Sequence, residues 1–443
     1  MKKLWIALGV IVVAVAAVWW YVTRIPPSPF DGVAEAPSVT LEEGEYAARL
    51  ADCVACHSTE TGAPFAGGLE MGTPLGSIFS TNITPDPEHG IGTYTLADFD
   101  NAVRRGVAPD GRRLYPAMPY PSYAKMSDAD VAALYDYFMN HVQPVAEPNR
   151  ETEIASPMNI RWPLELWNVA FYDRGSFAPD PEQDDLWNRG AYLVEGPGHC
   201  GSCHTPRTQL MNEVALDHTD PQFLSGALLD GWYAPPLRNG MNVGLGRWSE
   251  EDIVAYLRNG RNAHGTVFGS MMEAFNNSTQ FMTDEDLQAI AHFLKSLPGD
   301  PATDTPLWEY DGATTEMLAS GAGEPGAAIY LNRCSYCHGR DGMGQGSFLP
   351  PLAGASSLIG PHADSAINIV LNGAGRVVSN GVPDSYRMPP FRVPLTDAEV
   401  AEVVTFIRQA WGNTGSAVTA AEVRTLRDRT DPTSDEVIVL QMR

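Results

Sequence analysis

Positive charge is scarce in this sequence. The chain has 29 lysine and arginine residues against 54 aspartate and glutamate residues, which gives a formal net charge of -25 spread along its length. Phosphate backbones would repel such a chain, so we exclude nucleic acid as a partner. We interpret the acidic excess as a solvated surface rather than as a dedicated charged docking face.

Several enzyme motifs are also missing from the sequence. It contains no glycine-rich dinucleotide-binding loop, no nucleophile elbow and no metalloprotease histidine pair. It also lacks the alternating pattern of a large sheet, so we expect an all-α fold with long loops. Any substrate-oxidising cofactor is therefore expected on another subunit. The length of 443 residues suggests about three domains plus an appendage.

Long apolar runs are missing except at the N-terminus. There an uncharged stretch from Leu4 to Val22 has about the length needed to cross a hydrocarbon core of about 30 Å. It ends in Trp19, Trp20 and Tyr21, which suit a membrane interface. A cleaved secretory signal is the alternative, but its apolar region is usually shorter, so we favour an uncleaved anchor. In both cases we expect the rest of the chain on the periplasmic side of the cytoplasmic membrane.

Cysteine is scarce too, and its placement is informative. Export would permit a disulfide framework, yet the six cysteines occur only as three Cys-x-x-Cys pairs, each followed at once by histidine. A structural zinc site needs four ligands close together, whereas these pairs lie far apart; a redox dithiol would not require the histidines. Haem attachment uses every residue, with two thioethers and a proximal imidazole. We therefore predict three covalently bound haem c groups, on Cys53, Cys56 and His57, on Cys200, Cys203 and His204, and on Cys334, Cys337 and His338.

The segments around the three motifs form a weak internal repeat. Each copy predicts a first helix that begins near a glycine, a middle helix that a glycine ends, and a last helix with a serine or threonine cap. An aromatic residue follows each cap by the same interval, which predicts a shared helix-packing position. The glycines are Gly44, Gly190 and Gly326 at the start and Gly106, Gly260 and Gly373 in the middle; the caps are Ser127, Thr283 and Thr396, and the aromatics Tyr137, Phe293 and Phe406.

These boundaries predict an anchor over residues 1–30 and three domains over 40–142, 180–300 and 320–443. Linkers would then occupy 143–179 and 301–319. The first linker carries Trp162 and Trp167, and we expect it to pack across domains rather than to contact the membrane or a quinone.

The three units resemble class I cytochrome c domains, in which a first and a last helix cross beside the haem. The resemblance implies a methionine from a loop before the last helix as the sixth iron ligand. Met118 and Met388 stand in such loops. The second unit offers Met271, Met272 and Met282, and spacing from the preceding glycine favours Met271. The other histidines show no common offset in the units, so we do not expect bis-histidine sites. Pro236 and Pro351 match the place where this family uses a proline carbonyl to orient the imidazole.

At longer range the chain resembles the triheme cytochrome c subunit of bacterial membrane-bound dehydrogenases. The resemblance covers most of the chain after about residue 40 and includes "FSTNITPDPEHGIG", "RGAYLVEGPGHCGSCHTPR" and "MPPFRVPLTDAEVAEVVTFIRQAWGN". It implies that the chain takes electrons from a pyrroloquinoline quinone (PQQ), flavin or molybdopterin dehydrogenase subunit and passes them to ubiquinone or a terminal oxidase. The segment "FGSMM" departs from the family, which more often has a single methionine after proline. The implied iron ligands are His57 with Met118, His204 with Met271, and His338 with Met388.

Iron bound by both histidine and methionine is closed to substrate, which indicates electron transfer rather than catalysis at each haem. The chain would then be an electron-transfer subunit of an oxidoreductase complex that itself lacks the substrate-oxidising site. One alternative is a haem enzyme of peroxidase type, in which one iron is five-coordinate. Another is a stand-alone shuttle that feeds an oxidase.

Overall fold

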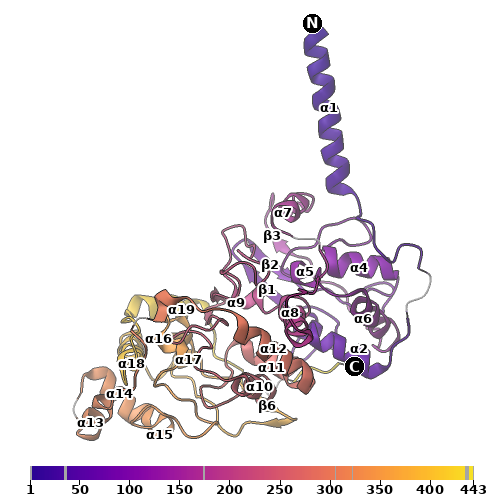
Figure 1. Cartoon of the computed structure of the whole chain (residues 1–443). Helices are drawn as coiled ribbons and strands as arrows, with labels where there is room; N and C mark the ends of the chain where they lie inside the picture. The colour runs from indigo at the N-terminus through magenta and orange to yellow at the C-terminus, as the bar shows by residue number, and fades with distance from the viewer. Residues whose placement is uncertain are drawn as a thin grey trace. The chain divides into compact units, whose positions relative to one another are not determined.

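The computed structural model describes residues 2–33, 37–172, 175–304, 306–321, 323–434 and 439–442 (Figure 1). The chain is mostly helical and divides into two compact units. The first comprises Met1–Ala178, Glu195–His199 and Gln441–Arg443, and the second Pro179–Val194 and Cys200–Leu440. The second unit thus holds the helices of two sequence repeats, and the division into three haem domains stays a prediction.

The first unit begins with helix α1 (Lys2–Thr23), which by length and composition could cross a membrane over Lys3–Val22. The remaining elements of the first unit are α2 (Leu41–Leu50), α3 (Cys53–His57), β1 (Glu70–Thr73), β2 (Gly76–Phe79), α4 (Leu96–Arg105), α5 (Tyr120–Tyr123), α6 (Asp128–Asn140), β3 (Glu153–Ile154) and α7 (Leu164–Phe171). The three strands form a small antiparallel sheet with the order β1-β2-β3.

The second unit contains two runs of helices, each interrupted by a small hairpin. The first run is α8 (Asp185–Glu195), α9 (Gly201–His204), β4 (Ala227–Leu229), β5 (Trp232–Ala234), α10 (Glu250–Asn259), α11 (Ser270–Asn277), η1 (Thr279–Phe281), α12 (Asp284–Ser296) and η2 (Pro301–Asp304). The second is α13 (Ala313–Ala319), α14 (Pro325–Arg333), α15 (Ser335–His338), α16 (Ser356–Ile359), α17 (Asp364–Asn372), β6 (Val378–Ser379), β7 (Val382–Pro383), α18 (Asp397–Gln409) and α19 (Ala420–Arg429).

The predicted caps of the last helices and the glycine ends of α4 and α10 are confirmed, but the first helices begin before the predicted glycines, α2 at Leu41 and α8 at Asp185. The hydroxyl groups of Ser127, Thr283 and Thr396 each accept a hydrogen bond from the backbone N–H three residues on, which satisfies a donor that the helix leaves unpaired. Helices α4 and α10 end at Gly106 and Gly260, both with positive φ, a conformation that glycine adopts without a steric penalty.

The shared packing position of the aromatics is confirmed as well. In each repeat the glycine of the first helix lies against the aromatic of the last helix. A Cβ placed on Gly44 would lie 2.7 Å from the Cβ of Tyr137, and one on Gly190 would lie 2.7 Å from the Cβ of Phe293. Gly326 stands in the same relation to Phe406, at 3.0 Å. The missing side chain therefore lets the two helices approach closely at their crossing.

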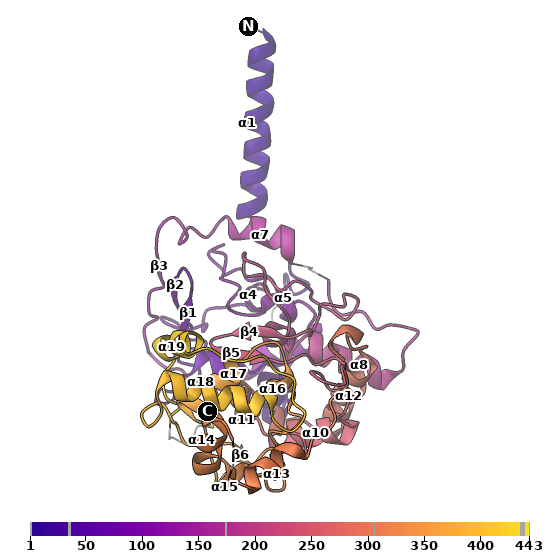
Figure 2. The same ribbon diagram turned by 90° about the vertical axis from the view of Figure 1, so that its left-hand side faces the viewer.

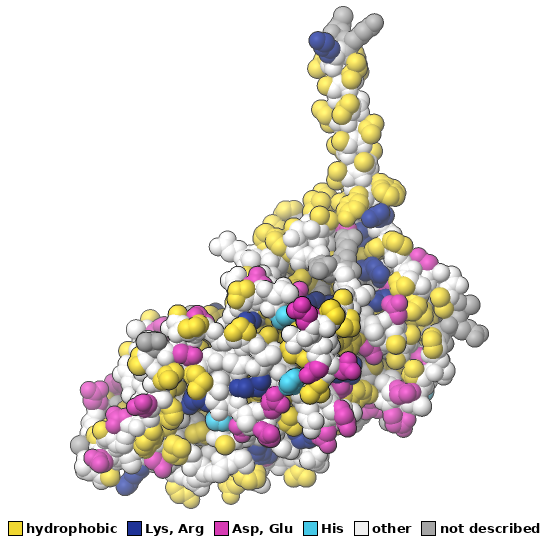
Figure 3. Space-filling view, in the orientation of Figure 1, with side chains coloured by type: hydrophobic (Ala, Val, Ile, Leu, Met, Phe, Trp, Pro, Cys, Tyr) yellow, Lys and Arg dark blue, Asp and Glu magenta, His cyan; other side chains and the backbone are white. Residues whose placement is uncertain are grey.

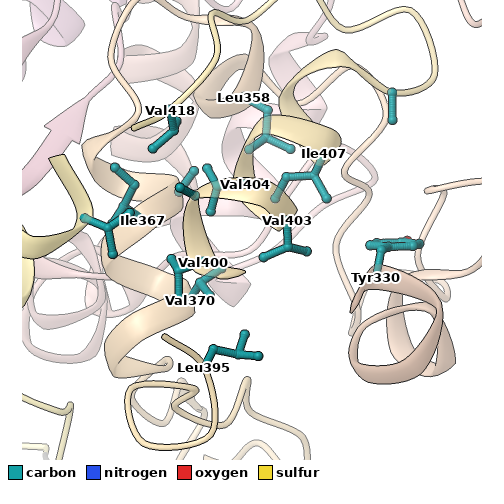
Figure 4. Close-up of a cluster of buried hydrophobic side chains, with 14 of the residues drawn as sticks. Tyr330, Leu358, Ile367, Val370, Leu395, Val400, Val403, Val404, Ile407 and Val418 are labelled. Carbon is teal, nitrogen blue, oxygen red and sulfur yellow. The ribbon is translucent and has the colours of Figure 1, made fainter. Parts of the chain in front are cut away.

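The core of the third repeat shows the helical pattern clearly. Helix α18 buries apolar residues at positions three and four apart, which is the inward stripe of an amphipathic helix. Figure 4 shows these side chains converging with residues of α16 and α17. The cluster includes Leu358, Ile367, Val370, Leu395, Val400, Val403, Val404, Ile407 and Val418.

The expectation of an all-α fold is incomplete because, in the part of the chain that the structure describes, three small antiparallel sheets accompany the helices. Two of the hairpins turn at Asp230-Gly231 and at Asn380-Gly381, where both residues have positive φ. Asp-Gly and Asn-Gly are the usual sequence signals of such tight turns. The strands are only two to four residues long, too short to produce an alternating pattern.

Candidate haem-binding sites

Each Cys-x-x-Cys-His motif forms a single helical turn directly after the first helix of its repeat. In the second and third motifs the backbone N–H of the histidine donates to the carbonyl of the first cysteine, at 3.0 Å for His204 and Cys200 and 3.0 Å for His338 and Cys334. The first motif is the short helix α3. Residues at positions i, i+3 and i+4 share one face of a helix, so each turn presents two sulfurs and an imidazole together.

One nitrogen of each motif histidine is held by a backbone carbonyl. The Nδ1 atom lies 2.6 Å from the Thr81 oxygen in His57, 2.7 Å from the Pro235 oxygen in His204 and 3.1 Å from the Pro350 oxygen in His338. A carbonyl can only accept, so Nδ1 carries the proton and Nε2 keeps its lone pair for a metal. The three repeats share this arrangement.

The expected roles of Pro236 and Pro351 are wrong by one residue. The orienting carbonyls belong to Pro235 and Pro350, and each is followed by one of the expected prolines. A proline restricts the residue before it to extended conformations, which fixes the direction of that residue's carbonyl. In the first unit Thr81 supplies the carbonyl without a following proline, so the sequence carried no signal for it.

The protonation states of the motif side chains suit haem attachment. Desolvation lowers the pKa of His57, His204 and His338, partly opposed by their carbonyl contacts, so the imidazoles are neutral as a metal ligand must be. Desolvation also raises the pKa of Cys200 and of Cys334 to about 12. A redox-active dithiol has the opposite property, a cysteine with a lowered pKa.

The donor geometry does not match zinc either. Among the residues that the structure describes, no group of three or more His, Cys, Asp and Glu side chains is arranged to hold a metal ion. A structural zinc site uses four such ligands in a tetrahedron. Each motif instead offers one imidazole nitrogen and two cysteine sulfurs, the donors that covalent attachment of haem would use.

Met118 and Met388 are partly buried, and both lie outside helices in the stretch before the last helix of their repeat. The backbone around Met118 is a tight turn in which its carbonyl accepts from the N–H of Tyr120 at 2.8 Å. The Met388 carbonyl accepts from the N–H of Ala374 at 3.0 Å, and its side chain packs against the core of the third repeat. Both positions agree with the sequence prediction of a loop methionine.

The three candidate methionines of the second repeat, Met271, Met272 and Met282, lie in different surroundings. Met271 belongs to the first turn of helix α11 rather than to a loop, so that part of the expectation is wrong. Met272 is buried in a cluster with Val267 and Phe275 and fills the space beside Gly375. Met282 is also buried, at 5% exposure. Met271 is partly buried at the edge of the cluster and is the most exposed of the three.

His199 precedes Cys200 directly but has surroundings of its own. Its ring meets that of Tyr123 edge to face, with centroids 5.6 Å apart. The Tyr123 hydroxyl donates to the Ala51 carbonyl at 2.6 Å, close to the first motif. Both contacts lie within the first compact unit. His199 is therefore a packed neighbour of the first motif, and the turn of the second motif contains His204 instead.

Comparisons of the sequence with known proteins show the family of the chain. The cytochrome c family model matches residues 188–298 and 323–411. The chain is 49% identical to the alcohol dehydrogenase (quinone) cytochrome c subunit of Gluconacetobacter polyoxogenes, over 90% of this chain and 86% of the relative. It is 47% identical to the gluconate 2-dehydrogenase cytochrome c subunit of Pantoea cypripedii, over 89% and 90%. For the fructose dehydrogenase cytochrome subunit of Gluconobacter japonicus, the identity is 36% over 91% and 85%.

The chain belongs to the family of dehydrogenase cytochrome c subunits. Cytochrome c proteins carry covalently bound haem c, and the residues of this cytochrome c subunit fit that group. Each motif supplies two sulfurs and a neutral imidazole on one helical face. The family resemblance seen in the sequence is thereby confirmed, and electron transfer follows as the general role of the chain.

Proposed function

We propose that the chain is a membrane-anchored electron-transfer subunit with three haem c groups. In this proposal Cys53 with Cys56, Cys200 with Cys203, and Cys334 with Cys337 attach the haems. His57 with Met118, His204 with Met271, and His338 with Met388 bind the irons. The subunit accepts electrons from a catalytic dehydrogenase that oxidises an alcohol, an aldehyde or a sugar, and it delivers them to ubiquinone or a terminal oxidase.

The observation that carries the proposal is the histidine arrangement repeated in all three motifs. Each Nδ1 atom lies within hydrogen-bond distance of a backbone carbonyl, and each imidazole is neutral. The carbonyl fixes the ring orientation and keeps the proton on Nδ1, so that Nε2 is presented to the iron. When bound, haem iron supplies a one-electron redox couple whose potential the axial ligands adjust. A methionine on the opposite face would close the iron to substrate.

The packing of the second unit supports transfer between the second and third repeats. The Tyr233 N–H donates to Ser365 Oγ at 2.9 Å, and Asn368 Nδ2 donates to the Gly231 carbonyl at 3.0 Å. These bonds join the β4-β5 hairpin of one repeat to α17 of the next. Because electron tunnelling falls steeply with distance, a fixed contact between repeats favours transfer over swinging domains.

The relatives and helix α1 support the proposed partner and location. The relatives are named as cytochrome subunits of alcohol, gluconate and fructose dehydrogenases, so we propose a catalytic subunit of that kind with a PQQ, flavin or molybdopterin cofactor. Helix α1 would anchor the chain in the cytoplasmic membrane, with the haem-binding units on the periplasmic side. In this arrangement the chain reaches both a periplasmic dehydrogenase and a membrane quinone.

The first test counts the haems. Alkaline pyridine haemochrome spectra and the intact mass of the purified chain are expected to give three haem c groups. The double variant Cys200→Ala with Cys203→Ala should retain two. A wild-type value other than three would contradict the proposal.

The second test asks what reduces the haems. The complex is purified in mild detergent, and its absorption is followed after addition of ethanol, acetaldehyde, gluconate or fructose. We expect a dehydrogenase subunit to co-purify and one of these compounds to reduce the haems. Repeated purification of the cytochrome alone would favour the stand-alone shuttle, and an iron that lacks methionine ligation in the wild type would favour the haem enzyme.

A further inference from the structure

Helix α7 of the first unit has its polar side inward and its apolar side outward. Glu165 and Asn168 are 3% and 1% exposed, whereas the exposed fractions of Leu166 and Val169 are 48% and 55%. The Asn168 side-chain oxygen accepts from the Tyr120 hydroxyl at 2.7 Å, so the buried polar groups have partners. A helix on a water-facing surface has the reverse pattern. The outer face of α7 therefore suits an apolar surrounding.

One arginine ties this helix to the foot of α1. The Arg113 guanidinium forms a buried ion pair with Glu165, with Nε and Oε2 3.1 Å apart. Its Nη2 atom also donates to the carbonyls of Val22 and Arg24, at 2.9 Å and 2.8 Å. Figures 1 and 2 both show α7 at the end of α1 where that helix meets the first unit. The position of α7 relative to α1 is thus fixed by charged and hydrogen-bonded contacts.

The outward apolar face extends beyond α7. Between residues 156 and 171 the charged side chains are Arg161, whose guanidinium lies 3.5 Å from the centroid of the Tyr115 ring, and Glu165, which is buried. In Figure 3 apolar side chains continue from α1 onto the surface at its foot. We call the exposed set the interfacial patch; it consists of Met158, Ile160, Trp162, Leu166 and Val169.

The interfacial patch is continuous with the apolar helix. The Trp162 ring meets the Trp19 ring edge to face, with centroids 6.0 Å apart. Trp19 lies near the end of the stretch Lys3–Val22, where a membrane-spanning helix would leave the hydrocarbon core. Tryptophan is enriched at that depth because its ring is apolar and its N–H is polar. Trp19 and Trp162, which are distant in the chain, thus lie at the same height along the axis of α1.

We propose that the interfacial patch rests on the lipid surface from which α1 emerges. The proposal depends on the membrane anchoring proposed above and adds a second contact of the first unit with the same bilayer. The occupant is the bilayer interface, because the patch adjoins the membrane-spanning stretch and exposes no acidic group in a chain of net charge -25. Burial of apolar side chains, rather than attraction to anionic lipid, supplies the affinity.

This second contact would fix the orientation of the first unit. A domain that is attached to the membrane by a single helix can change its tilt relative to the bilayer. A second contact through the patch would hold one face of the domain against the bilayer surface. The Tyr115 hydroxyl donates to the Met158 carbonyl at 3.2 Å, and Tyr120 is bonded to Asn168. These two tyrosines flank the turn that contains Met118. The turn that contains Met118 therefore lies next to the patch.

Photocrosslinking in the full-length holoprotein tests the proposal. The photoreactive residue p-benzoylphenylalanine replaces Leu166, Val169, Val13 or Leu75, one position at a time. Each variant is reconstituted in phosphatidylcholine nanodiscs, irradiated and analysed for lipid adducts by mass spectrometry. Val13 reports on α1, and Leu75, which is 52% exposed elsewhere in the first unit, is the matched control. We expect lipid adducts at positions 13, 166 and 169, at least fivefold above position 75.

The outcomes separate this proposal from the membrane anchor. Adducts at position 13 with only background at 166 and 169 would overturn the interfacial patch and leave the anchor intact. Background at all four positions would overturn both. Irradiation of the same variants in native membranes tests a protein occupant. Crosslinks from 166 and 169 to a dehydrogenase subunit instead of lipid would also overturn the proposal.

Discussion

The Met272 side chain packs directly against Gly375 and leaves no room for a Cβ on that glycine. It is buried beside Phe275 and Val267, while Met271 lies at the edge of this cluster. The two adjacent methionines therefore have different expected roles. Met272 fills the core, whereas Met271 would bind the iron of the middle haem in the proposed arrangement.

Replacing each methionine with alanine separates these roles. We expect Met271→Ala to abolish the sulfur-to-iron absorption band of the middle haem and to lower its reduction potential, because a thioether ligand is lost. Met272→Ala should keep the band but lower the free energy of unfolding by about 2–5 kcal/mol, because a buried cavity remains. Absorption spectra and denaturant unfolding measure the two effects. Loss of the band in Met272→Ala alone would reverse the assignment.

The glycine at the α8-α12 crossing should be intolerant of any side chain. A Cβ on Gly190 would collide with the Ala289 carbonyl and would lie 2.7 Å from the Cβ of Phe293. We expect Gly190→Ala to lower the free energy of unfolding by about 1–3 kcal/mol, as overpacking of a core does. Gly265→Ala is the control, because nothing lies within 4 Å of a Cβ there. Guanidinium unfolding followed by circular dichroism compares the two, and equal midpoints would show that the helices can move apart.

Acid should weaken the third repeat through Asp397. Hydrogen bonds and charge from Arg427 and Arg424, with Asp397 oxygens 2.7 Å and 3.2 Å from their Nε atoms, lower the pKa of this carboxyl. In the folded chain Asp397 binds fewer protons than in the unfolded chain, so its contribution to stability is complete above the unfolded pKa of about 3.9 and is lost as pH falls through the lower folded value.

We therefore expect Asp397→Asn to have a lower unfolding midpoint than the wild type at pH 6, by a small amount because the carboxylate is partly exposed. The gap should narrow as the pH falls through the lowered pKa of Asp397. Urea unfolding from pH 6 to pH 2 measures it, because urea does not screen charges. A gap that stays constant down to pH 2 would show that the ion pairs do not contribute to it.

Local patterns in the sequence predicted much of this molecule. The caps at Ser127, Thr283 and Thr396 and the aromatics ten residues later depend on interactions within one helix or on a repeated crossing, which three copies make visible. The hairpins had short signals, Asp-Gly and Asn-Gly, but their strands are too short for the period-two pattern to appear.

Contacts between residues that are far apart in the chain could not be predicted from the sequence. The Thr81 carbonyl reaches His57 across 24 residues, and nothing about a threonine identifies that partner. Which of Met271 and Met272 packs against Gly375, about a hundred residues away in the chain, could not be read from the sequence. The sequence led us to expect that the first linker packs across domains, whereas Trp162, Leu166 and Val169 are exposed. Its outward face became visible only when the buried Glu165 and Asn168 showed which side of α7 points inward.

The Arg113-Glu165 pair should be essential for holding α7 at the foot of α1. The side chains are 1% and 4% exposed, so removing the cation leaves a buried carboxylate without its charge partner. We expect Arg113→Met to lower the free energy of unfolding of the first unit by about 3–5 kcal/mol. Arg112→Met is the matched control, because that arginine is 50% exposed and its contact with Asp110 is a surface pair that contributes at most about 1 kcal/mol.

Hydrogen exchange can show where the loss of Arg113 acts. Exchange should rise in α7 and in the last turn of α1, because both depend on the same guanidinium, and it should stay unchanged in α18 of the second unit. The double variant Arg113→Met with Glu165→Leu removes both charges and should recover much of the stability, since an apolar pair of similar volume can replace a buried ion pair. No recovery in the double variant would mean that the bonds from Arg113 to the α1 carbonyls, rather than the ion pair, hold α7 in place.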